Sequence, residues 1–197
     1  MCGIAGIMTF GGQPPVEERV VTAMRETLSH RGPNGGCTWV DEARRIGLGH
    51  RRLSIIDLAE TASQPMANED GRIHLVFNGE IYNHADLRAE LSRSGTHQWA
   101  TDHSDTETIV HGFEEWGIDC VHRLRGMFAM AIWDARERAL WLVRDRIGIK
   151  PLYYRVDGGK IAFASEIKAL LELPDTPRRV HEEALFHYLS FLTTPGT

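Results

Sequence analysis

The chain has 197 residues, 42% of them hydrophobic and 25% charged, and a formal net charge of -5 at pH 7. These values are typical of a globular protein with a sizeable buried core, and they leave no basic surface for nucleic acid. No apolar run approaches the ~20 residues of a membrane span and no signal-peptide pattern is found, which predicts a cytoplasmic protein without membrane contact.

Hydrophobic spacing predicts short strands and one helix in the first third of the chain. Residues 2–10 are expected to form a buried strand, and apolar residues at helical spacing predict a helix over about 16–29. The stretch HRGPNGG at 30–36 contains a proline and three glycines, so it is expected to be a loop. Further strands are predicted over about 37–41, 45–50 and 53–57.

The middle of the chain is predicted to hold one strand and two helices. The strand over 73–77 is expected to end abruptly at the Asn-Gly-Glu sequence of 78–80, and a helix is expected over 83–94. The S-x-x-E spacing at 104–107 is that of a capping box, which predicts a helix that starts there and stops at Gly117.

The last third begins with two nearly continuous apolar runs, 127–133 and 139–143, which predict strands covered on both faces. The remaining expected elements are strands over about 152–156 and 160–164 and helices over 166–171 and 182–192. Short strands in neighbouring pairs, with helices grouped between them, predict stacked sheets with helices outside. This pattern differs from the βαβ alternation of a Rossmann fold.

Cysteine and histidine spacing argues against a metal centre. The three cysteines, Cys2, Cys37 and Cys120, cannot all pair and show no CxxC spacing, which favours a reducing compartment. Cys37 and Cys120 are expected to be ordinary buried or half-buried thiols. The histidines are scattered, without HExxH or paired spacing, so no metal ligands are expected among His50, His74, His84, His97, His103 and His111.

Cys2 directly follows the initiator methionine. Removal of Met1 would give Cys2 both a thiol, with a pKa of ~8.5, and a free α-amine, with a pKa of ~7.7–8.0. Such an amine can activate its own nucleophile without a separate histidine. An apolar edge strand that happens to begin with cysteine is an equally good interpretation of these residues alone.

Five further positions have the residue types that amide chemistry on an amino acid needs. Asn78 and Gly79 offer a side-chain amide and a backbone N–H as an oxyanion-binding pair, although Asn-Gly is also a common hairpin turn. Arg52 is a candidate clamp for a carboxylate, or an ordinary surface charge. Asp105 and Glu80 could hold an ammonium group, but Asp105 also suits the first turn of a helix and Glu80 could simply face solvent.

The motifs, taken together, resemble the glutaminase domain of the asparagine synthetase family. Members of this family are class II glutamine amidotransferases of the N-terminal-nucleophile type. The resemblance rests on CGI (2–4), HRGP (30–33), GHRRLSIID (49–57), NGEIYN (78–83) and SDTE (104–107). The segments LRGMFA (124–129), RDRIGIKPLYY (144–154) and FASE (163–166) are also similar, so the match runs in order from residue 2 to about residue 195. The T-R-W-A-T-H-G stretch of the glucosamine-phosphate synthases is absent, which favours the asparagine synthetase branch.

The resemblance implies an α+β fold, a four-layer αββα sandwich of two stacked, mainly antiparallel sheets. It also implies a reaction in which Cys2 attacks the side-chain amide of glutamine, with its own freed α-amine as the base. Asn78 and the Gly79 N–H would form the oxyanion hole. A glutamyl thioester would form, ammonia would leave, and water would release glutamate.

The resemblance assigns the rest of the site to holding the substrate. Arg52 would bind the α-carboxylate of glutamine, and Asp105 and Glu80 its ammonium group. Ile55 and Ile56 would line the pocket, partly through their backbone. No metal belongs to this site.

The resemblance divides the chain into an amidotransferase domain at 1–175 and, at 176–197, the start of a linker and helix. That segment would lead to an ATP-dependent synthetase domain, since no S-G-G-x-D-S pyrophosphate loop occurs here. The domain itself would need no cofactor, and Mg-ATP would belong to the synthetase domain. The expected partners are L-glutamine and the covalently linked synthetase domain, and a homodimer is possible. Neither nucleic acid nor a membrane is expected as a partner.

The most direct function is supply of ammonia for the conversion of aspartate to asparagine. Two alternatives stay open at this point. The first is an amidotransferase domain of the same family that serves a sugar or a secondary metabolite. The second is a catalytically silent, glutamine-binding paralogue, which a retained Met1 would favour because the α-amine could not then act as base.

Overall fold

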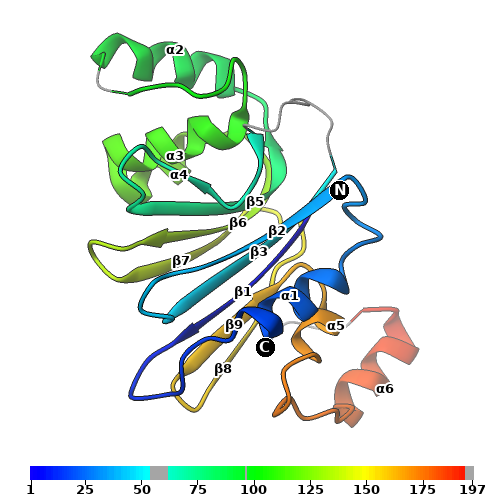
Figure 1. Cartoon of the computed structure of the whole chain (residues 1–197). Helices are drawn as coiled ribbons and strands as arrows, with labels where there is room; N and C mark the ends of the chain where they lie inside the picture. The colour runs from blue at the N-terminus through cyan, green and yellow to red at the C-terminus, as the bar shows by residue number, and fades with distance from the viewer. Residues whose placement is uncertain (54–61, 96, 194–197) are drawn as a thin grey trace.

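The structure, a computed structural model, describes residues 1–53, 62–95 and 97–193. In that part of the chain the strands form two antiparallel sheets that stack on each other (Figure 1). The first sheet has the order β2-β3-β1-β9-β8, with β1 Gly3–Thr9, β2 Gly35–Val40, β3 Ile46–Arg52, β8 Tyr153–Asp157 and β9 Lys160–Ala164. The second has the order β4-β5-β6-β7, with β4 Met66–Ala67, β5 Ile73–Ile81, β6 Gly126–Asp134 and β7 Ala139–Arg144.

Helices cover the outer face of each sheet. The first sheet is covered by α1 (Glu18–Glu26) and α5 (Ile167–Leu170). The second is covered by α3 (Asp105–Trp116), with α2 (His84–Ser94) packed against it. The short turns η2 (Gly117–Asp119) and α4 (Cys120–Arg123) follow α3, and α6 (Glu182–Phe191) lies beyond α5 (Figure 1). The arrangement is the predicted four-layer αββα sandwich.

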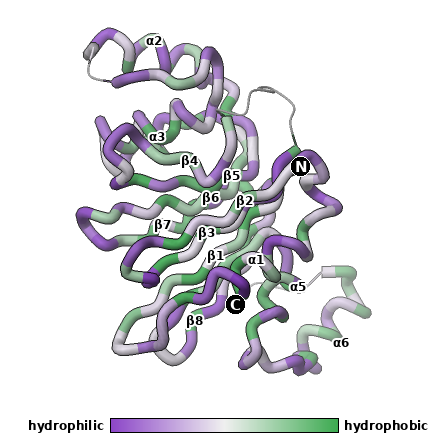
Figure 2. The backbone as a smooth tube through the Cα atoms, in the orientation of Figure 1, coloured by the Kyte–Doolittle hydropathy of each residue, from purple (hydrophilic) through white to green (hydrophobic). Residues whose placement is uncertain are grey.

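The alternation of side chains along β5 explains how the core is divided. Leu75 and Phe77 pack toward α3, whereas Val76 packs between the sheets with residues such as Phe163 of β9. Because successive side chains of a strand point to opposite faces, the next residue on the inter-sheet face is Asn78. A polar amide is therefore buried at the end of an apolar layer. Figure 2 shows hydrophobic residues along the central strands and hydrophilic ones at the hairpin turns.

The prediction that the strand stops at Asn78-Gly79-Glu80 is wrong. β5 continues to Ile81, and Asn78, Gly79 and Glu80 pair with Ala129, Phe128 and Met127 of β6. The reason is a close approach of the two backbones. A Cβ on Gly79 would lie 2.3 Å from the Met127 carbonyl oxygen, and one on Gly126 would lie 2.1 Å from that of Glu80. Glycine at both positions lets the ladder continue where sequence rules predict a break.

Three smaller expectations also fail. α1 is shorter than the helix predicted over 16–29. Val16 and Leu28 are buried although they lie outside the helix, and they therefore extend the apolar spacing beyond its two ends. β2 begins at Gly35, inside the expected loop. β7 is an edge strand rather than a strand covered on both faces, and Trp141 is 40% exposed on it.

Other predictions are confirmed, or they concern residues outside the described part of the chain. The helices expected over 83–94 and from 104–107 are present, and Ser104 Oγ accepts the Glu107 N–H at 3.4 Å as the cap. Of the strand expected over 53–57, Leu53 is not in a strand and 54–57 lies outside the described residues. Among the helices described, none is long and apolar enough to cross a bilayer.

Candidate active site

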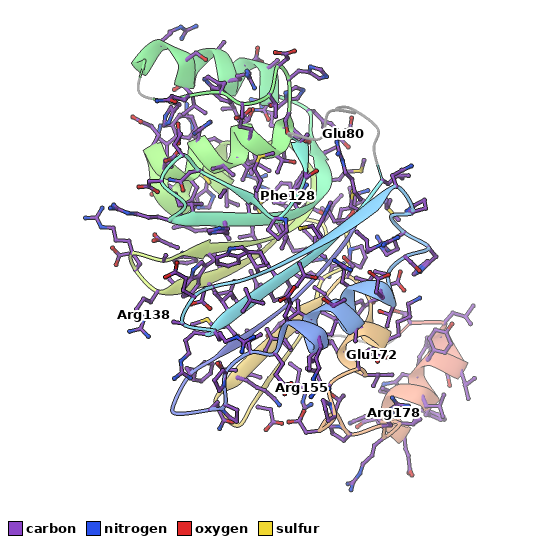
Figure 3. The ribbon with its side chains drawn as sticks, in the orientation of Figure 1. Glu80, Phe128, Arg138, Arg155, Glu172 and Arg178 are labelled. Atoms are coloured by element: carbon purple, nitrogen blue, oxygen red, sulfur yellow. The ribbon has the colours of Figure 1, made fainter. Side chains whose placement is uncertain are left out.

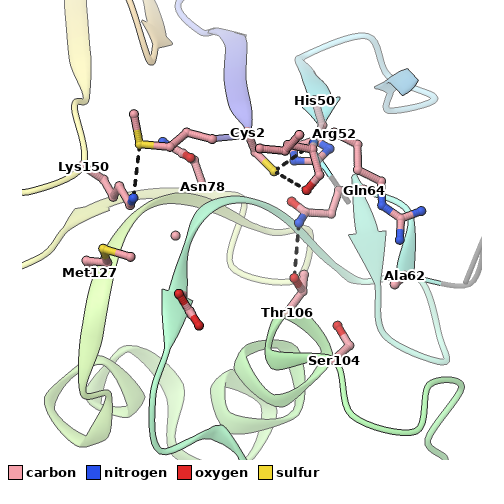
Figure 4. A pocket seen from close by; sticks show the side chains of 14 residues that line it. Cys2, His50, Arg52, Ala62, Gln64, Asn78, Ser104, Thr106, Met127 and Lys150 are labelled. Atoms are coloured by element: carbon pink, nitrogen blue, oxygen red, sulfur yellow. Dashed lines mark hydrogen bonds between the residues drawn. The ribbon is translucent and has the colours of Figure 1, made fainter. Parts of the chain in front are cut away.

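A cavity of about 200 Å³ lies where β1 begins and β3 and β5 end (Figure 4). Five of the residues predicted for the site line it: Cys2, Arg52, Asn78, Gly79 and Glu80. Their positions in the sequence are up to 78 residues apart, so the fold alone brings them together. Asp105 does not line the cavity, although its neighbours Ser104 and Thr106 do, and Ile55 and Ile56 lie outside the described residues.

Cys2 lies immediately before β1, and its sulfur contacts the backbone of Leu53. The Leu53 N–H lies 3.4 Å from Sγ, and the thiol lies 3.7 Å from the Leu53 carbonyl oxygen. Burial raises the pKa of the thiol, and this outweighs the opposing effects of the Leu53 hydrogen bond and the Arg52 charge. The thiol is therefore the resting form, and it needs a base to become a nucleophile.

Arg31 fixes the backbone of Cys2. Its Nε donates to the Cys2 carbonyl oxygen at 2.9 Å, and its Nη1 donates to Glu166 Oε1 at 2.9 Å. Burial acts to raise the pKa of Glu166, but hydrogen bonds from Arg31, His30 and Lys168 outweigh it and lower that pKa to about 2. The HRGP motif thus has a structural role, because it links the start of β1 to the residue preceding α5.

Replacing Glu166 with glutamine is expected to lower the free energy of unfolding by about 1–2 kcal/mol at pH 7, because Arg31 loses a charged partner. Since the folded-state pKa is lowered to about 2, the carboxylate stabilises the fold fully above the unfolded pKa of ~4.3. The difference between wild type and Glu166→Gln should therefore shrink as the pH falls from ~4.3 toward 2. Denaturant titrations at pH 7 and pH ~3 measure it.

Glu172→Gln is the matched control, because Glu172 is an exposed carboxylate close by in the chain, after α5 (Figure 3). It should change stability little at either pH. A Glu166→Gln variant as stable as wild type at pH 7 would contradict the role given to the Glu166–Arg31 pair.

Asn78 supplies the first of two hydrogen-bond donors in this cavity. Its side chain faces the inter-sheet layer and the residue is 1% exposed. The Nδ2 atom has no hydrogen-bond partner among the described residues. A buried amide N–H₂ without a partner is costly in a folded protein, so its presence in a cavity points to a ligand oxygen that it binds.

The backbone N–H of Gly79 supplies the second donor, and the neighbouring hydrogen bonds fix its direction. Phe128, the residue opposite Gly79, directs both its N–H and its carbonyl to Asp145, away from β5. On β5, the N–H groups of Phe77 and Ile81 donate to Gln64 Oε1 and Asp105 Oδ2, on the edge away from β6. Because N–H directions alternate along a strand, the Gly79 N–H points to that same edge.

Charged side chains of both signs line the cavity. Arg52, at the end of β3, and Glu80, on β5, both line it. Asp105 is 7% exposed, and its Oδ2 accepts the Ile81 N–H at 3.1 Å. Burial raises the pKa of Asp105 and the Glu80 charge adds to this, whereas the Ile81 hydrogen bond lowers it. Asp105 and Glu80 are therefore close enough for their charges to interact, although only Glu80 lines the cavity.

Sequence reasoning missed several residues that line the cavity, among them Gln64, His50 and Lys150. Gln64 accepts the Phe77 N–H at 2.6 Å and donates to Thr106 Oγ1 at 3.2 Å, so it joins β5 to α3. Burial lowers the pKa of His50 to about 3, so this imidazole is neutral. The Lys150 Nζ lies 3.2 Å from Met1 Sδ. The one sequence signal for Lys150 was its position inside the RDRIGIKPLYY segment, which is similar to the family. No catalytic role was assigned to that segment from the sequence.

The other two cysteines lie outside this cavity. Cys120 is buried as expected, and burial raises its pKa to about 12. Cys37 is exposed on β2, so the expectation of a buried or half-buried thiol is wrong for it. The cause is the edge position of β2, which leaves this face of the strand open to solvent.

Cys2 at the head of an inner strand of an αββα sandwich, in one cavity with Asn78 and Gly79, is the arrangement that the resemblance to glutamine amidotransferases predicts. The chain belongs to the glutamine amidotransferase domain family, whose model matches residues 1–197. It is 40% identical over 201 residues to asparagine synthetase [glutamine-hydrolyzing] 3 of Bacillus subtilis, covering 100% of this chain and 32% of that protein. It is 43% identical to asparagine synthetase [glutamine-hydrolyzing] 2 of the same species, covering 94% of this chain and 24% of the relative.

One more curated relative and one solved structure are also similar to this chain. Amidase chry2 of Gibberella zeae is 38% identical, over 87% of this chain and 26% of its own length. Among solved structures, glutamine phosphoribosylpyrophosphate amidotransferase from B. subtilis matches with a TM-score of 0.71 at 20% identity, covering 86% of this chain and 43% of that one. That likeness supports the fold alone. The chain spans between 24% and 32% of the length of these three curated relatives.

Proposed function

We propose that this domain hydrolyses the side-chain amide of L-glutamine to glutamate and ammonia through a glutamyl thioester on Cys2. The observation that carries the proposal is the pairing of the Cys2 thiol with an unpartnered, buried Asn78 Nδ2 in one cavity. A thiol alone is common, but a thiol beside preorganised donors is what acyl transfer requires.

The proposed reaction begins with removal of Met1, which frees the Cys2 α-amine. The amine takes the thiol proton, and the sulfur attacks the amide carbon of glutamine. Asn78 Nδ2 and the Gly79 N–H hold the oxyanion of the tetrahedral intermediate. The protonated amine gives its proton to the departing nitrogen, so ammonia leaves and the thioester remains. The amine then takes a proton from water, and the resulting hydroxide attacks the thioester carbon. The C–S bond breaks, glutamate leaves, and the thiolate takes the proton back from the amine.

The charged residues would orient the substrate for this attack. The Arg52 guanidinium would bind the α-carboxylate, and Asp105 and Glu80 would bind the ammonium group. Ile55 and Ile56 complete the proposed pocket. None of these steps needs a metal or an organic cofactor, and a chelator should therefore leave the chemistry at Cys2 unchanged.

A glutamine-like diazoketone tests the assignment of the nucleophile. It should add covalently to Cys2 alone, as shown by peptide mass spectrometry, and excess L-glutamine should protect the thiol from it. Cys37, which is exposed, serves as the internal control for non-specific alkylation. Equal labelling of Cys37 and Cys2, unaffected by glutamine, would overturn the assignment.

Arg52→Lys is expected to raise KM for glutamine by about 10–100-fold, because lysine keeps the charge but loses the two-point contact with a carboxylate. kcat should change less, since the substrate carboxylate stays remote from the reacting carbon. Steady-state ammonia release measures both parameters. The rate of Cys2 alkylation by iodoacetamide, which has no carboxylate, should stay as in wild type, and an unchanged KM would contradict the clamp.

We also propose that residues 1–175 form the amidotransferase domain and that 176–197 lead to an ATP-dependent synthetase domain that uses the ammonia to convert aspartate to asparagine. The names of the Bacillus relatives and the fraction of their length that this chain spans support this proposal. So does α6, whose apolar side chains are exposed, for instance Phe186 at 65% and Leu189 at 72%. Assays of the full-length protein with aspartate and with other acceptors would identify the product.

A further inference from the structure

Four potential metal ligands from three separate segments of the chain come together beside α3. Glu69 lies in the turn between β4 and β5, His97 lies in the connection between α2 and α3, and His111 and Glu114 lie one turn apart on α3. One ligand atom from each residue lies within 4.8 Å of all the others. Sequence spacing predicted no such group, because 28 residues separate Glu69 from His97 and 14 separate His97 from His111.

The distances within the cluster are close to those of a coordination sphere. Glu114 Oε2 lies 2.6 Å from His111 Nδ1 and 3.4 Å from His97 Nδ1. Glu69 Oε2 lies 4.0 Å from His111 Nδ1. Ligands at ~2.0–2.1 Å from a tetrahedral zinc ion are about 3.4 Å apart, so small side-chain movements would suffice.

Each carboxylate is already oriented through its other oxygen. Asn68 Nδ2 donates to Glu114 Oε1 at 2.7 Å, and the Gln98 N–H donates to Glu69 Oε1 at 2.7 Å. Such outer contacts are typical of protein metal sites, where they fix the ligand in one orientation. Both glutamates therefore keep one oxygen free of these contacts and turned toward the histidines.

The two histidines are buried around the same point. The side chains of His111 and His97 are 2% and 7% exposed, and their rings lie 4.6 Å apart. The Nε2 atom of each has no hydrogen-bond partner among the described residues. Glu107 Oε1 lies 3.9 Å from His111 Nε2, on the side away from the cluster, in the place of the carboxylate that commonly supports a metal-bound histidine.

We propose that Glu69, His97, His111 and Glu114 bind a zinc ion. Two imidazoles and two carboxylates form a mixed nitrogen and oxygen set that suits Zn²⁺, and the two negative charges of the carboxylates match the ion. Four protein ligands leave no open position, so the ion is structural and not catalytic. It ties the β4–β5 turn and the α2–α3 connection to α3, the helix whose first residue, Asp105, lies beside the cavity.

Zinc titration of the metal-free protein tests the proposal independently of glutamine hydrolysis. One Zn²⁺ per chain should bind, and Tm should rise by roughly 5–10 °C at ~100-fold excess over Kd. Mg²⁺ should give no shift, because it prefers oxygen ligands and keeps its waters. Co²⁺ should bind with the visible absorption of a tetrahedral site.

Two variants assign the site, and one matched variant controls for other surface histidines. Glu69→Gln and His97→Ala should each weaken zinc binding at least 10-fold and reduce the zinc-dependent shift in Tm. Glu69 lies on an exposed turn, so Glu69→Gln should fold normally. His122→Ala, at an exposed histidine outside the cluster, should bind zinc as wild type does.

Either of two results would overturn the inference. In the first, zinc neither binds stoichiometrically nor raises Tm, and the four residues are an ion-pair cluster around His111. In the second, Glu69→Gln and His97→Ala bind zinc as tightly as wild type, and the ion lies elsewhere. Activity toward glutamine enters neither readout, so failure of the proposed function would leave this test intact.

Discussion

Replacing Cys2 with alanine should abolish ammonia release from glutamine, with a fall in kcat of at least ~10⁴-fold. The variant has no atom that can form the thioester, and no described residue of the cavity offers a second thiol. Glutamine should still bind, because Arg52, Asn78 and Glu80 stay in place. Ammonia production and equilibrium binding of glutamine, measured on one preparation, separate the loss of chemistry from a loss of binding.

Cys37→Ala provides the control for this experiment. Cys37 is an exposed thiol on the edge strand β2, so its removal should leave kcat and KM unchanged. Ammonia release that persists in Cys2→Ala, at a rate near that of wild type, would rule out the thioester mechanism.

Blocking the α-amine of Cys2 should have an effect of similar size. A cleavable N-terminal extension that ends directly before Cys2 keeps the nitrogen in a peptide bond, where it is not basic. The uncut protein should release ammonia at least ~10²-fold more slowly than the cut protein, because general base catalysis contributes about 10²–10⁴-fold. The raised pKa of the buried thiol strengthens this expectation, since little thiolate forms without a base.

The residue that precedes Cys2 lies at the same cavity. Met1 lines it, and the Lys150 Nζ lies 3.2 Å from the Met1 sulfur. Peptide mass spectrometry before and after cleavage, together with ammonia release, relates the N-terminal residue directly to turnover. Cleavage of a matched extension from Cys2→Ala should restore nothing. Full activity of the uncut protein would show that another group acts as the base.

Local signals fixed much of the fold. The Ser104–Glu107 capping spacing and the left-handed Gly95 after α2 are satisfied by neighbours in sequence, so the helices that they bound were predictable. β6 was recognised because it is apolar on both faces and is buried on both. Predictions failed where distant partners decide the outcome. β5 extends through Asn78-Gly79-Glu80 because β6 lies opposite it, and β7 is exposed because, among the described strands, it pairs with β6 alone.

The residues of the proposed active site divide in the same way. The sequence by itself determined which residues are candidates for the proposed chemistry: Cys2 after Met1, the Asn78-Gly79 donors, and the Arg52, Glu80 and Asp105 charges. Tertiary structure alone decided their geometry. It placed the Gly79 N–H on the open edge of β5 and turned Asp105 toward Ile81, and it brought His97 and His111 together. Directions and distances between distant residues depend on how sheets and helices pack, and residue spacing along one chain does not specify them.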